Sequence, residues 1–481
     1  VVKASAGASI NGLLEFKEIE ALRATRVMGV IEPDRSAPAA MISAMTVGPN
    51  IARVNADDAW GLGYDGTGIV VANIDTGVRY THEALVASYR GNDGAGGFNH
   101  NYNWWDPYGA YNYPYDGNNH GSHTMGTMVG SVADVYAIGM APGAEWIACR
   151  GCGTSSCGSL ELFSCAQWVV APWNLSGSPA TADPDRRPHV VNNSWGDCRT
   201  SYDGWFQGVV DSWHAAGIYP IFSAGNASNC GYPEPPPCGS VGNPGRYGNV
   251  TTVGSTGQAN GAYAPHSNRG PTDSADTVNG GSYPTIKPQV VAPGEGILSA
   301  TAGGDAAYES WDGTSMSAPH VAGLVALIWQ AAPCLIGDYA ATETLIQESA
   351  TPITTGLPGA CSGEGPDQYP NQSTGWGEID ALAAVQLAAA SCHALTGTVT
   401  DAATGDPIDG VLIQATSAVG AYSATSDATG TYRITMPAGT YQVNAAAFGY
   451  QPVEYPDVLV DESDETLDAA LEVAEWHTVA I

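Results

Sequence analysis

The sequence predicts an α/β fold, a parallel sheet with helices on both faces, joined to a small all-β sandwich. Between about residues 48 and 390, short apolar strands alternate with helical segments, which is typical of strands buried on both faces of a sheet. After Cys392 the helices stop, and alternating strands separated by Gly-containing turns continue to about residue 474. We therefore expect two folded domains, over residues 47–390 and 393–474.

Three segments of the first domain are predicted as buried strands: residues 68–75, 190–192 and 218–223. Functional groups on a parallel sheet gather at the carboxyl ends of its strands. Asp75 ends the first strand and Asn226 follows the third, so both are candidate site residues. Residues 61–66 fit G-x-G-x-x-G, but they precede a strand instead of following one, which argues against a dinucleotide site.

The composition limits the possible partners. With 44% hydrophobic residues, the 481-residue chain can bury a sizeable core. Its 48 acidic and 16 basic side chains give a formal net charge of −32, which would repel nucleic acids and anionic membranes. No apolar run reaches the ~18 to 20 residues needed to cross a bilayer. We expect no nucleic-acid partner, no membrane span, and a charge that serves solubility outside the cell.

The ten cysteines, an even number, favour disulfides and an oxidising compartment. Four of them lie close together: Cys149, Cys152, Cys157 and Cys165. A zinc or iron-sulfur site is the alternative there, although the spacing matches no metal signature. Sequence alone does not determine the pairing; the first pairs we expect are Cys230 with Cys238 and Cys334 with Cys361.

The first 46 residues differ from the rest. Residues 13–24 are predicted as a helix and 26–31 as a strand, followed by Glu32-Pro33-Asp34. Residues 36–44, rich in Ala, Ser and Pro, indicate a linker or an exposed cleavage region. The N-terminus lacks the pattern of a signal peptide, so we expect a processed or trimmed chain.

Ser315 lies where a turn of small residues meets an apolar run, residues 324–329, with the spacing of a buried helix. At a helix start the backbone N–H groups lack partners and the aligned peptide dipoles favour negative charge. Ser315 is therefore a candidate nucleophile. An ordinary helix cap is the alternative.

A serine nucleophile needs a base and a group that orients the base. His120 is the best candidate base, because small residues around it allow close packing. His120 and His123 would alternatively ligate a metal, but no acidic third ligand accompanies them at helical spacing. Asp75 is the candidate orienting acid, with capping of the following turn as the alternative. Asn226 and the backbone N–H of Ser315 are candidate donors to an oxyanion.

The order Asp, His, Ser, with the Asn between the last two, resembles the subtilisin family of serine endopeptidases. The likeness covers about residues 48–390 and is greatest to the bacillopeptidase F group, through residues 60–68, 191–196 and 222–226. The resemblance implies that Asp75 orients His120, the general base and then acid. It also implies that Ser315 is the nucleophile and that Asn226 completes the oxyanion hole.

The resemblance further implies where a substrate binds. An extended edge to which a peptide adds as a strand would consist of Ser194, Trp195 and Gly196. The pocket for the residue before the scissile bond would be walled by Ala224, Gly225 and Gly242. Neither motif places an acid at the base of this pocket, so we expect neutral or apolar side chains there instead of Lys or Arg. Asn192 and Asn226 begin N-x-S/T sequences, which we treat as coincidence because a glycan would fill the cleft.

Two features depart from the family. The serine block is Ser315-Met316-Ser317-Ala318-Pro319 where the family commonly has Ser-Met-Ala-Ser-Pro, an exchange that should leave the chemistry intact. Residues 131–136 lack the asparagine-rich pattern that often holds a structural calcium, and Asp134 is the candidate ligand that remains. We expect no cofactor for catalysis, and a structural calcium whose ligands the sequence does not assign.

The flanking segments also resemble known modules. Residues 1–46 resemble the last part of a subtilisin propeptide, which implies a folding aid and inhibitor whose tail lies in the cleft until it is cut; a simple extension is the alternative. Residues 393–474 are similar to the carboxypeptidase regulatory-like domain, through residues 397–401, 429–432 and 438–441. That likeness implies a fold and surface attachment or stability, without chemistry. Residues 475–481 resemble a linker.

These expectations combine into a secreted serine endopeptidase that acts on proteins or peptides, extracellular or attached to the cell surface. The alternative is a catalytically silent or latent surface or structural protein built on the protease fold. The complete set of Asp75, His120, Ser315 and Asn226 favours the enzyme.

Overall fold

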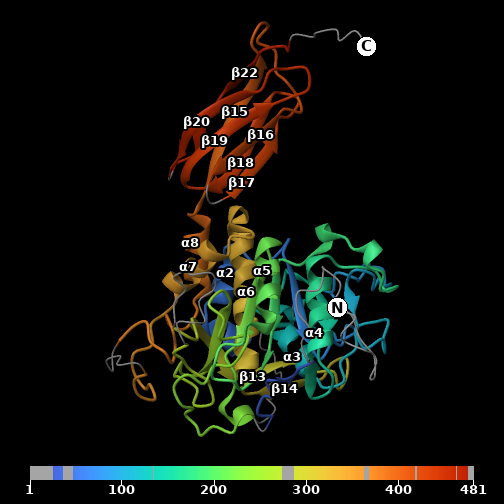
Figure 1. Ribbon diagram of the computed structural model, residues 1–481, viewed down its shortest axis with the longest axis vertical. Helices are drawn as coiled ribbons and strands as arrows, with labels where there is room; N and C mark the ends of the chain where they lie inside the picture. Colours follow the sequence, from blue (N-terminus) through green and yellow to red (C-terminus); the bar gives the residue numbers. More distant parts are fainter. Residues whose placement is uncertain are drawn as a thin grey trace, which may run out of the picture. The chain divides into compact units, whose positions relative to one another are not determined.

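A computed structural model describes the following residues: 25–35, 47–133, 135–272, 286–361, 368–417, 420–461 and 463–474. The chain divides into two compact units. The first contains the described residues up to Gln330, together with Gly337–Ala384. The second contains Ala331–Ile336 and the described residues from Val385 onward, whose strands are drawn in red in Figure 1.

The first unit contains a seven-stranded sheet in which all neighbouring strands are parallel. Across the sheet the order is β12 (Val290–Glu295), β11 (Thr251–Gly257), β10 (Tyr219–Ser223), β8 (Val190–Asn193), β2 (Val70–Asp75), β6 (Glu145–Arg150) and β3 (Trp104–Trp105). Every residue of β8, β10 and β11 is buried, which explains why their sequences do not alternate between polar and apolar residues. The predicted fold class is confirmed.

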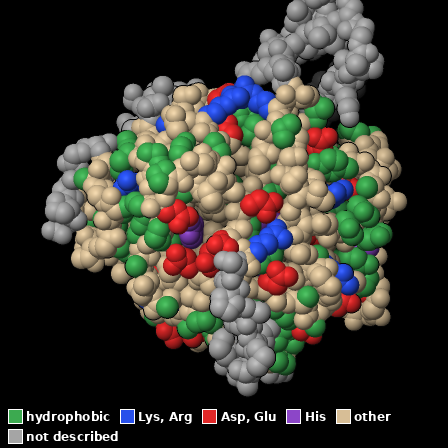
Figure 2. Space-filling model, turned by 90° about the horizontal axis from the view of Figure 1, so that it is seen from below, with side chains coloured by type: hydrophobic (Ala, Val, Ile, Leu, Met, Phe, Trp, Pro, Cys, Tyr) green, Lys and Arg blue, Asp and Glu red, His purple; other side chains and the backbone are tan. Residues whose placement is uncertain are grey.

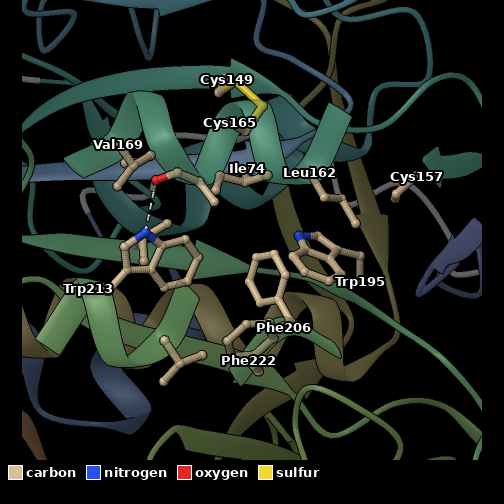
Figure 3. Packing of buried hydrophobic residues seen from close by; sticks show 14 of the residues in the cluster. Ile74, Cys149, Cys157, Leu162, Cys165, Val169, Trp195, Phe206, Trp213 and Phe222 are labelled. Carbon is tan, nitrogen blue, oxygen red and sulfur yellow. Dashed lines mark hydrogen bonds between the residues drawn. A yellow bond between two sulfur atoms is a disulfide. The ribbon is translucent and has the colours of Figure 1, made fainter. Parts of the chain in front are cut away.

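One face of the sheet is covered by α4 (Ser159–Val170) and α5 (Gln207–Ala215). Figure 3 shows Ile74 of β2 in a buried cluster with side chains of both helices. Trp213 of α5 is fully buried and donates its Nε1–H to the carbonyl oxygen of Ala166, 3.2 Å away. The hydrogen bond satisfies the one polar atom of this large side chain.

The other face of β2 is covered by α3 (His120–Val129). Because side chains alternate along a strand, Asn73 faces α3 and donates to the carbonyl oxygen of Gly121, 3.1 Å away. The helix α6 (Thr314–Ala331) packs on α3, where Gly323 lies against the backbone of Met128. Helices therefore lie on both faces of the sheet, as predicted.

The apolar run after Ser315 forms a central helix. All α6 residues from Thr314 to Trp329 are buried, as the sequence spacing predicted. A helix that is buried on all sides is held rigidly by its neighbours. The first turn of α6, which contains Ser315, is therefore fixed relative to the sheet.

Shorter elements complete the first unit. The helices are α1 (Pro49–Arg53), α2 (Ala56–Gly61), α7 (Tyr339–Ser349) and α8 (Ala381–Ala389), whose last residues belong to the second unit. The strands are β1 (Val27–Val30), β4 (Ser131–Val132), β5 (Tyr136–Ala137), β7 (Ser156–Gly158), β9 (Trp195–Gly196), β13 (Ile297–Ala300) and β14 (Tyr308–Trp311). Among the described helices, none is both long and apolar enough to span a membrane.

All ten cysteines lie in the described residues and are paired. The disulfides are Cys149–Cys165, Cys152–Cys157, Cys198–Cys230, Cys238–Cys361 and Cys334–Cys392. The two pairs expected first, Cys230 with Cys238 and Cys334 with Cys361, are wrong. The four clustered cysteines form two disulfides instead of a metal site. Cys198 follows β9, and Cys230 lies in the loop after β10. Because β8 and β10 are neighbours, the loops that follow them bring these two cysteines together across 32 residues.

The second unit consists of two sheets around a buried cluster. Its strands are β15 (Cys392–Asp401), β16 (Leu412–Ser417), β17 (Gly420–Thr425), β18 (Thr431–Pro437), β19 (Gly439–Ala446), β20 (Val453–Val460), β21 (Glu465–Thr466) and β22 (Ala469–Leu471). The alternating strands predicted after Cys392 are confirmed, among them β15, β16, β18 and β19. The pairing is not wholly antiparallel, because β15 pairs in parallel with β21 and β22.

The strand predicted over residues 26–31 is confirmed as β1. The predicted helix over residues 13–24, the linker over 36–44, Asp134 and the tail over 475–481 lie outside the described residues. Charged side chains lie mainly on the surface. On the face drawn in Figure 2, acidic side chains gather near the centre with fewer basic ones beside them. An excess of acidic groups gives the surface a potential that attracts cations.

Candidate active site

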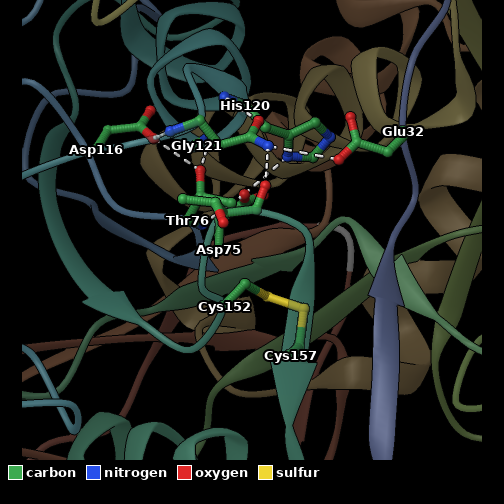
Figure 4. The surroundings of a disulfide bond; sticks show 10 residues. Glu32, Asp75, Thr76, Asp116, His120, Gly121, Cys152 and Cys157 are labelled. Carbon is green, nitrogen blue, oxygen red and sulfur yellow. Dashed lines mark hydrogen bonds and ion pairs between the residues drawn. A yellow bond between two sulfur atoms is a disulfide. The ribbon is translucent and has the colours of Figure 1, made fainter.

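Asp75 and His120 form a buried pair at the carboxyl end of β2. Nδ1 of His120 lies 2.7 Å from Oδ1 of Asp75, and the two residues are 0% and 1% exposed (Figure 4). The same carboxylate oxygen accepts a hydrogen bond from the backbone N–H of Thr76, 2.7 Å away. Burial lowers the pKa of His120, but the carboxylate of Asp75 outweighs this effect, so the pKa lies above its ordinary value.

A second acid, Asp116, supports this pair and was missed from the sequence. Its Oδ1 accepts a hydrogen bond from Oγ1 of Thr76 at 2.9 Å, and its Oδ2 accepts from the backbone N–H of Ser122 at 2.8 Å. Burial raises the pKa of Asp116. It therefore ties the residue after Asp75 to the helix of His120. Its position four residues before His120 was the available signal.

Glycines allow β2 and α3 to approach closely. A Cβ on Gly121 would lie 2.1 Å from the carbonyl oxygen of Gly77, far inside van der Waals contact. Gly77 itself has φ +111°, a conformation that other residues rarely adopt. The small residues around His120 therefore permit the close packing that was predicted.

Ser315 lies in the first turn of α6 and is fully buried. Its Oγ donates a hydrogen bond to the carbonyl oxygen of Ile31, 2.7 Å away. Nε2 of His120 is buried and has no hydrogen-bond partner among the described residues. Ser315 thus contacts the segment that contains Ile31 and Glu32, and no hydrogen bond joins it to His120 in this structure. Figure 4 shows Glu32 beside His120.

Asn226 is fixed by the residue that precedes the serine. Its Oδ1 accepts hydrogen bonds from the backbone N–H and from Oγ1 of Thr314, both at 2.9 Å. These contacts leave Nδ2 to donate to the carbonyl oxygen of Glu32, 3.1 Å away. The amide is held as a hydrogen-bond donor toward the chain in the cleft. Thr314 was not singled out from the sequence, although it stands directly before Ser315.

The segment containing β1 lies between two edge strands. β1 pairs antiparallel with β9, with Gly29 opposite Gly196, and antiparallel with β7, with Met28 opposite Cys157. The backbone N–H of Ile31 donates to the carbonyl oxygen of Ser194 at 3.3 Å. The structure therefore places an extended peptide on the edge formed by residues 194–196, where the sequence predicted that a substrate would add.

A cavity of 320 Å³ lies beside β1. Its lining includes all three predicted pocket residues, Ala224, Gly225 and Gly242, and also Ile31. It further includes Asp197, an acid that the two sequence motifs did not reveal although it follows Gly196 directly. Asp197 accepts a hydrogen bond from the backbone N–H of Asn243 at 2.8 Å and lies 3.7 Å from the guanidinium of Arg199. Its charge is therefore partly balanced within the chain.

His123 does not join His120 in a metal site. Its Nε2 lies 3.1 Å from the carbonyl oxygen of Glu309, and its ring stacks on Trp311 at 4.3 Å. Burial lowers the pKa of His123 to about 3, so the ring is neutral. In the described part of the chain, no group of three or more His, Cys, Asp or Glu side chains is arranged to hold a metal. The expected calcium stays a prediction without an assigned set of ligands.

Comparison with known proteins agrees with this geometry. The model of the subtilase family of peptidases matches residues 66–377, and that of the carboxypeptidase regulatory-like domain matches residues 394–472. The chain is 39% identical over 340 residues to Bacillopeptidase F of Bacillus subtilis, which covers 70% of this chain and 22% of that protein. It is 32% identical over 329 residues to an extracellular protease of Xanthomonas campestris, covering 67% of this chain and 47% of that protein.

For two further proteins, the match to this chain spans more of the other protein's length. Subtilisin Savinase of Lederbergia lenta is 31% identical over 295 residues, which is 60% of this chain and 87% of that protein. Fervidolysin from Fervidobacterium pennivorans, a keratinolytic enzyme of known structure, gives a TM-score of 0.49 at 19% identity, covering 93% of this chain and 68% of that one. The chain spans less than half the length of Bacillopeptidase F and of the Xanthomonas protease. Because the subtilase family model matches residues 66–377, the chain belongs to the subtilase family.

Proposed function

We propose that the chain is a secreted serine endopeptidase that hydrolyses peptide bonds through an acyl-enzyme on Ser315. The observation that carries the proposal is the buried pair of Asp75 and His120, joined at 2.7 Å. An acid on Nδ1 fixes the imidazole tautomer whose Nε2 accepts a proton. The proteases among the relatives support the same reaction.

In the proposed mechanism, Nε2 of His120 takes the proton from Oγ of Ser315 while this oxygen attacks the substrate carbonyl carbon. Asp75 stabilises the resulting imidazolium. Nδ2 of Asn226 and the backbone N–H of Ser315 donate hydrogen bonds to the oxyanion of the tetrahedral intermediate. His120 then gives the proton to the leaving amine, the C–N bond breaks, and water hydrolyses the acyl-enzyme by the same proton transfers.

Substrate peptides are proposed to bind as β1 binds, as a strand on the edge formed by Ser194, Trp195 and Gly196. Backbone hydrogen bonds on such an edge hold many sequences, so the side-chain pocket decides selectivity. Ala224, Gly225 and Gly242 line this pocket. Ile31, whose carbonyl oxygen accepts the hydrogen bond from Ser315, belongs to the same lining. An apolar residue at this position supports a preference for neutral or apolar side chains before the scissile bond.

The segment over residues 1–46 is proposed to act as an inhibitor of the same chain. Its described part, residues 25–35, supports this, because Ser315 and Asn226 are both hydrogen-bonded to it. Ser315 contacts the carbonyl oxygen of Ile31, whereas Asn226 contacts the carbonyl oxygen of the next residue, Glu32. Attack requires that the nucleophile and the oxyanion donor act on the same carbonyl. A segment held in this way would occupy the cleft without being cleaved.

The setting of the enzyme is part of the proposal. The relative named as an extracellular protease supports secretion. Attachment to the cell surface through the second domain is a further part of the proposal. We assign residues 47–390 to the peptidase domain, 393–474 to the β-sandwich and 475–481 to a linker. Catalysis on protein or peptide substrates needs no cofactor, and a calcium ion, if bound, would stabilise the fold.

A fluorophosphonate probe, which reacts with an activated serine, tests the proposal. A recognition sequence for a specific protease, inserted between residues 36 and 44, allows the full chain to fold before the segment is cut and removed. Labelling should rise after the cut, and a protein substrate such as casein should then be hydrolysed. A cut chain that neither reacts with the probe nor cleaves casein would favour the silent structural protein instead.

A further inference from the structure

Arg35 occupies a defined site beyond the catalytic serine. Its guanidinium carbon lies 4.4 Å from the centroid of the Trp311 ring, within the range of a cation–π contact. Its Nη1 donates to the carbonyl oxygen of Asn118 at 3.2 Å, and its Nη2 donates to Oδ1 of Asn118 at 2.8 Å. The cation is therefore bound by one aromatic face and by two oxygens of a single neighbouring residue.

The aromatic side of this site is rigid. Trp311 is fully buried and donates its Nε1–H to Oε2 of Glu309 at 2.9 Å. His123 stacks on the same ring system, with an interplanar angle of 6°. Because burial lowers the pKa of His123 to about 3, this neighbour carries no positive charge that would repel a bound cation. The hydrogen bond to Glu309 and the stacked imidazole orient the ring independently of Arg35.

The backbone delivers Arg35 to this site. The N–H of Asp34 donates to the carbonyl oxygen of Asp312 at 2.8 Å, and the N–H of Asp312 donates to the carbonyl oxygen of Asp34 at 2.9 Å. Any extended peptide that pairs with Asp312 in the same way presents its next residue to Trp311. The position follows from backbone pairing and applies equally to a substrate.

We propose that Trp311 and Asn118 form a subsite on the leaving-group side of the cleft that selects a cationic side chain of a protein substrate, with Arg preferred over Lys. The inference rests on the proposed function, because it treats residues 25–35 as lying where a substrate lies. A planar guanidinium stacks on an indole and donates to two oxygens at once, whereas an ammonium offers a point charge. The ion pair of Arg35 with Glu32 spans 3.2 Å, and its side chains are 35% and 38% exposed. Water screens such a pair, so it adds little to the selection.

The net charge of −32 supports the same chemistry. An acidic surface raises the local concentration of cationic peptides. This effect acts on every basic residue of a substrate and falls with ionic strength. The subsite acts at one position only, so the two contributions separate when the charge is moved along the peptide or the salt concentration is raised.

Peptide substrates test the subsite directly. The bond that is cleaved defines the position: Arg35 is the fourth residue after the Ile31–Glu32 bond and the third after Glu32–Pro33. Two series of peptides are compared, one varied only at the third residue after the cleaved bond and the other only at the fourth. In each series the varied residue is Arg, Lys, citrulline or norleucine. For one of these two positions, kcat/KM of the cut enzyme should be about 2- to 30-fold higher for Arg than for citrulline, its neutral analogue.

Variants separate the subsite from a general effect of charge. Trp311→Phe and Asn118→Ala should each lower the ratio of Arg to citrulline, whereas Trp105→Phe, a matched control at a tryptophan of β3, should leave it unchanged. Trp311→Leu removes the aromatic face altogether. If the Leu variant fails to fold, Trp311→Phe still gives the test. In the uncut chain, Arg35→Gln should speed fluorophosphonate labelling, and Arg35→Lys should have a smaller effect.

The outcomes distinguish the two proposals. If all peptides are cleaved but Arg and citrulline give equal kcat/KM at both positions, the subsite is refuted and the proposed function stands. A preference for Arg that persists in Trp311→Phe and Asn118→Ala would also refute it. If no peptide is cleaved and the probe does not react, the proposed function itself has failed.

Discussion

Oγ of Ser315 donates its hydrogen bond to the carbonyl oxygen of Ile31, 2.7 Å away. The proton that a base must remove is therefore directed at the chain in the cleft, while Nε2 of His120 has no partner among the described residues. Ser315, the proposed nucleophile, is thus hydrogen-bonded to that chain and not to His120, the proposed base. This contact supports a site that is blocked by residues 25–35 over a site that has lost its chemistry.

Replacing Asp75 tests the orientation of the base. In Asp75→Asn the amide stabilises the wrong tautomer of His120 and no longer balances the imidazolium. We expect kcat/KM of the cut enzyme to fall by about 10⁴-fold, as for other triads with this change. Asp305→Asn, at an exposed acid that binds Arg79, is the control and should retain activity. An equal loss in both variants would contradict the assigned role.

Replacing Asn226 tests the oxyanion donor. Asn226→Ala removes Nδ2, and kcat should fall by about 10² to 10³ with little change in KM, the range established on a subtilisin. Since Oδ1 also holds Thr314, the thermal midpoint of the variant must be measured beside its kinetics. Thr314→Val loses the hydroxyl that contacts Asn226 but keeps the amide donor. It should therefore lose less activity, and a larger loss than in Asn226→Ala would contradict this account.

The protonation of His120 predicts how kcat/KM falls at low pH. The base must be neutral to accept a proton, so kcat/KM should fall as the pH decreases through its pKa. Asp75 raises that pKa despite burial, which places the midpoint above the ordinary value of ~6.5. A pH profile of kcat/KM for a neutral peptide measures it. A midpoint near pH 4, or a rate independent of pH, would not fit His120 as the base.

His320 predicts a loss of stability in acid. It is buried in α6 between Asn50 and the carbonyl oxygen of Met316, and burial lowers its pKa to about 4. Because the unfolded chain takes up a proton below pH 6.5 and the folded chain does not until about pH 4, stability falls as the pH decreases through this window. Between pH 6.5 and 5 this residue accounts for about 2 kcal/mol of the free energy of unfolding.

Urea unfolding at pH 7 and pH 5 measures this effect. His320→Gln cannot be protonated, so the difference in stability between the two pH values should shrink by about 2 kcal/mol relative to the wild type. His393→Gln, in the second unit, is the control and should leave the difference unchanged. If His320→Gln loses as much stability on acidification as the wild type, the buried histidine is not the cause.

The sequence was sufficient for features that depend on local pattern. The apolar strands, the buried helix α6 and the strand β1 follow from the hydrophobicity of single segments. Asp75, His120 and Asn226 were proposed from the sequence because each stands at a strand end, shortly after one, or at a helix start. Their meeting in space follows from the parallel sheet, whose carboxyl ends share one edge.

The remaining features depend on contacts between distant segments. The partners of Cys230 and Cys334 were missed because the order of strands, and not the distance along the chain, decides which loops meet. Asp116 contacts Thr76, which lies 40 residues away, and its position four residues before His120 does not reveal that partner. The contact of Arg35 with Trp311 likewise requires the register of Asp34 on Asp312.

The most direct test of the central claim is to map the fluorophosphonate adduct by mass spectrometry in the chain cut between residues 36 and 44. We expect a single adduct on the peptide that contains Ser315, formed faster after the cut than before it. Ser315→Ala, with an unchanged circular dichroism spectrum, should form none. An adduct on another serine, or labelling that persists in Ser315→Ala, would contradict the claim that Ser315 is the nucleophile.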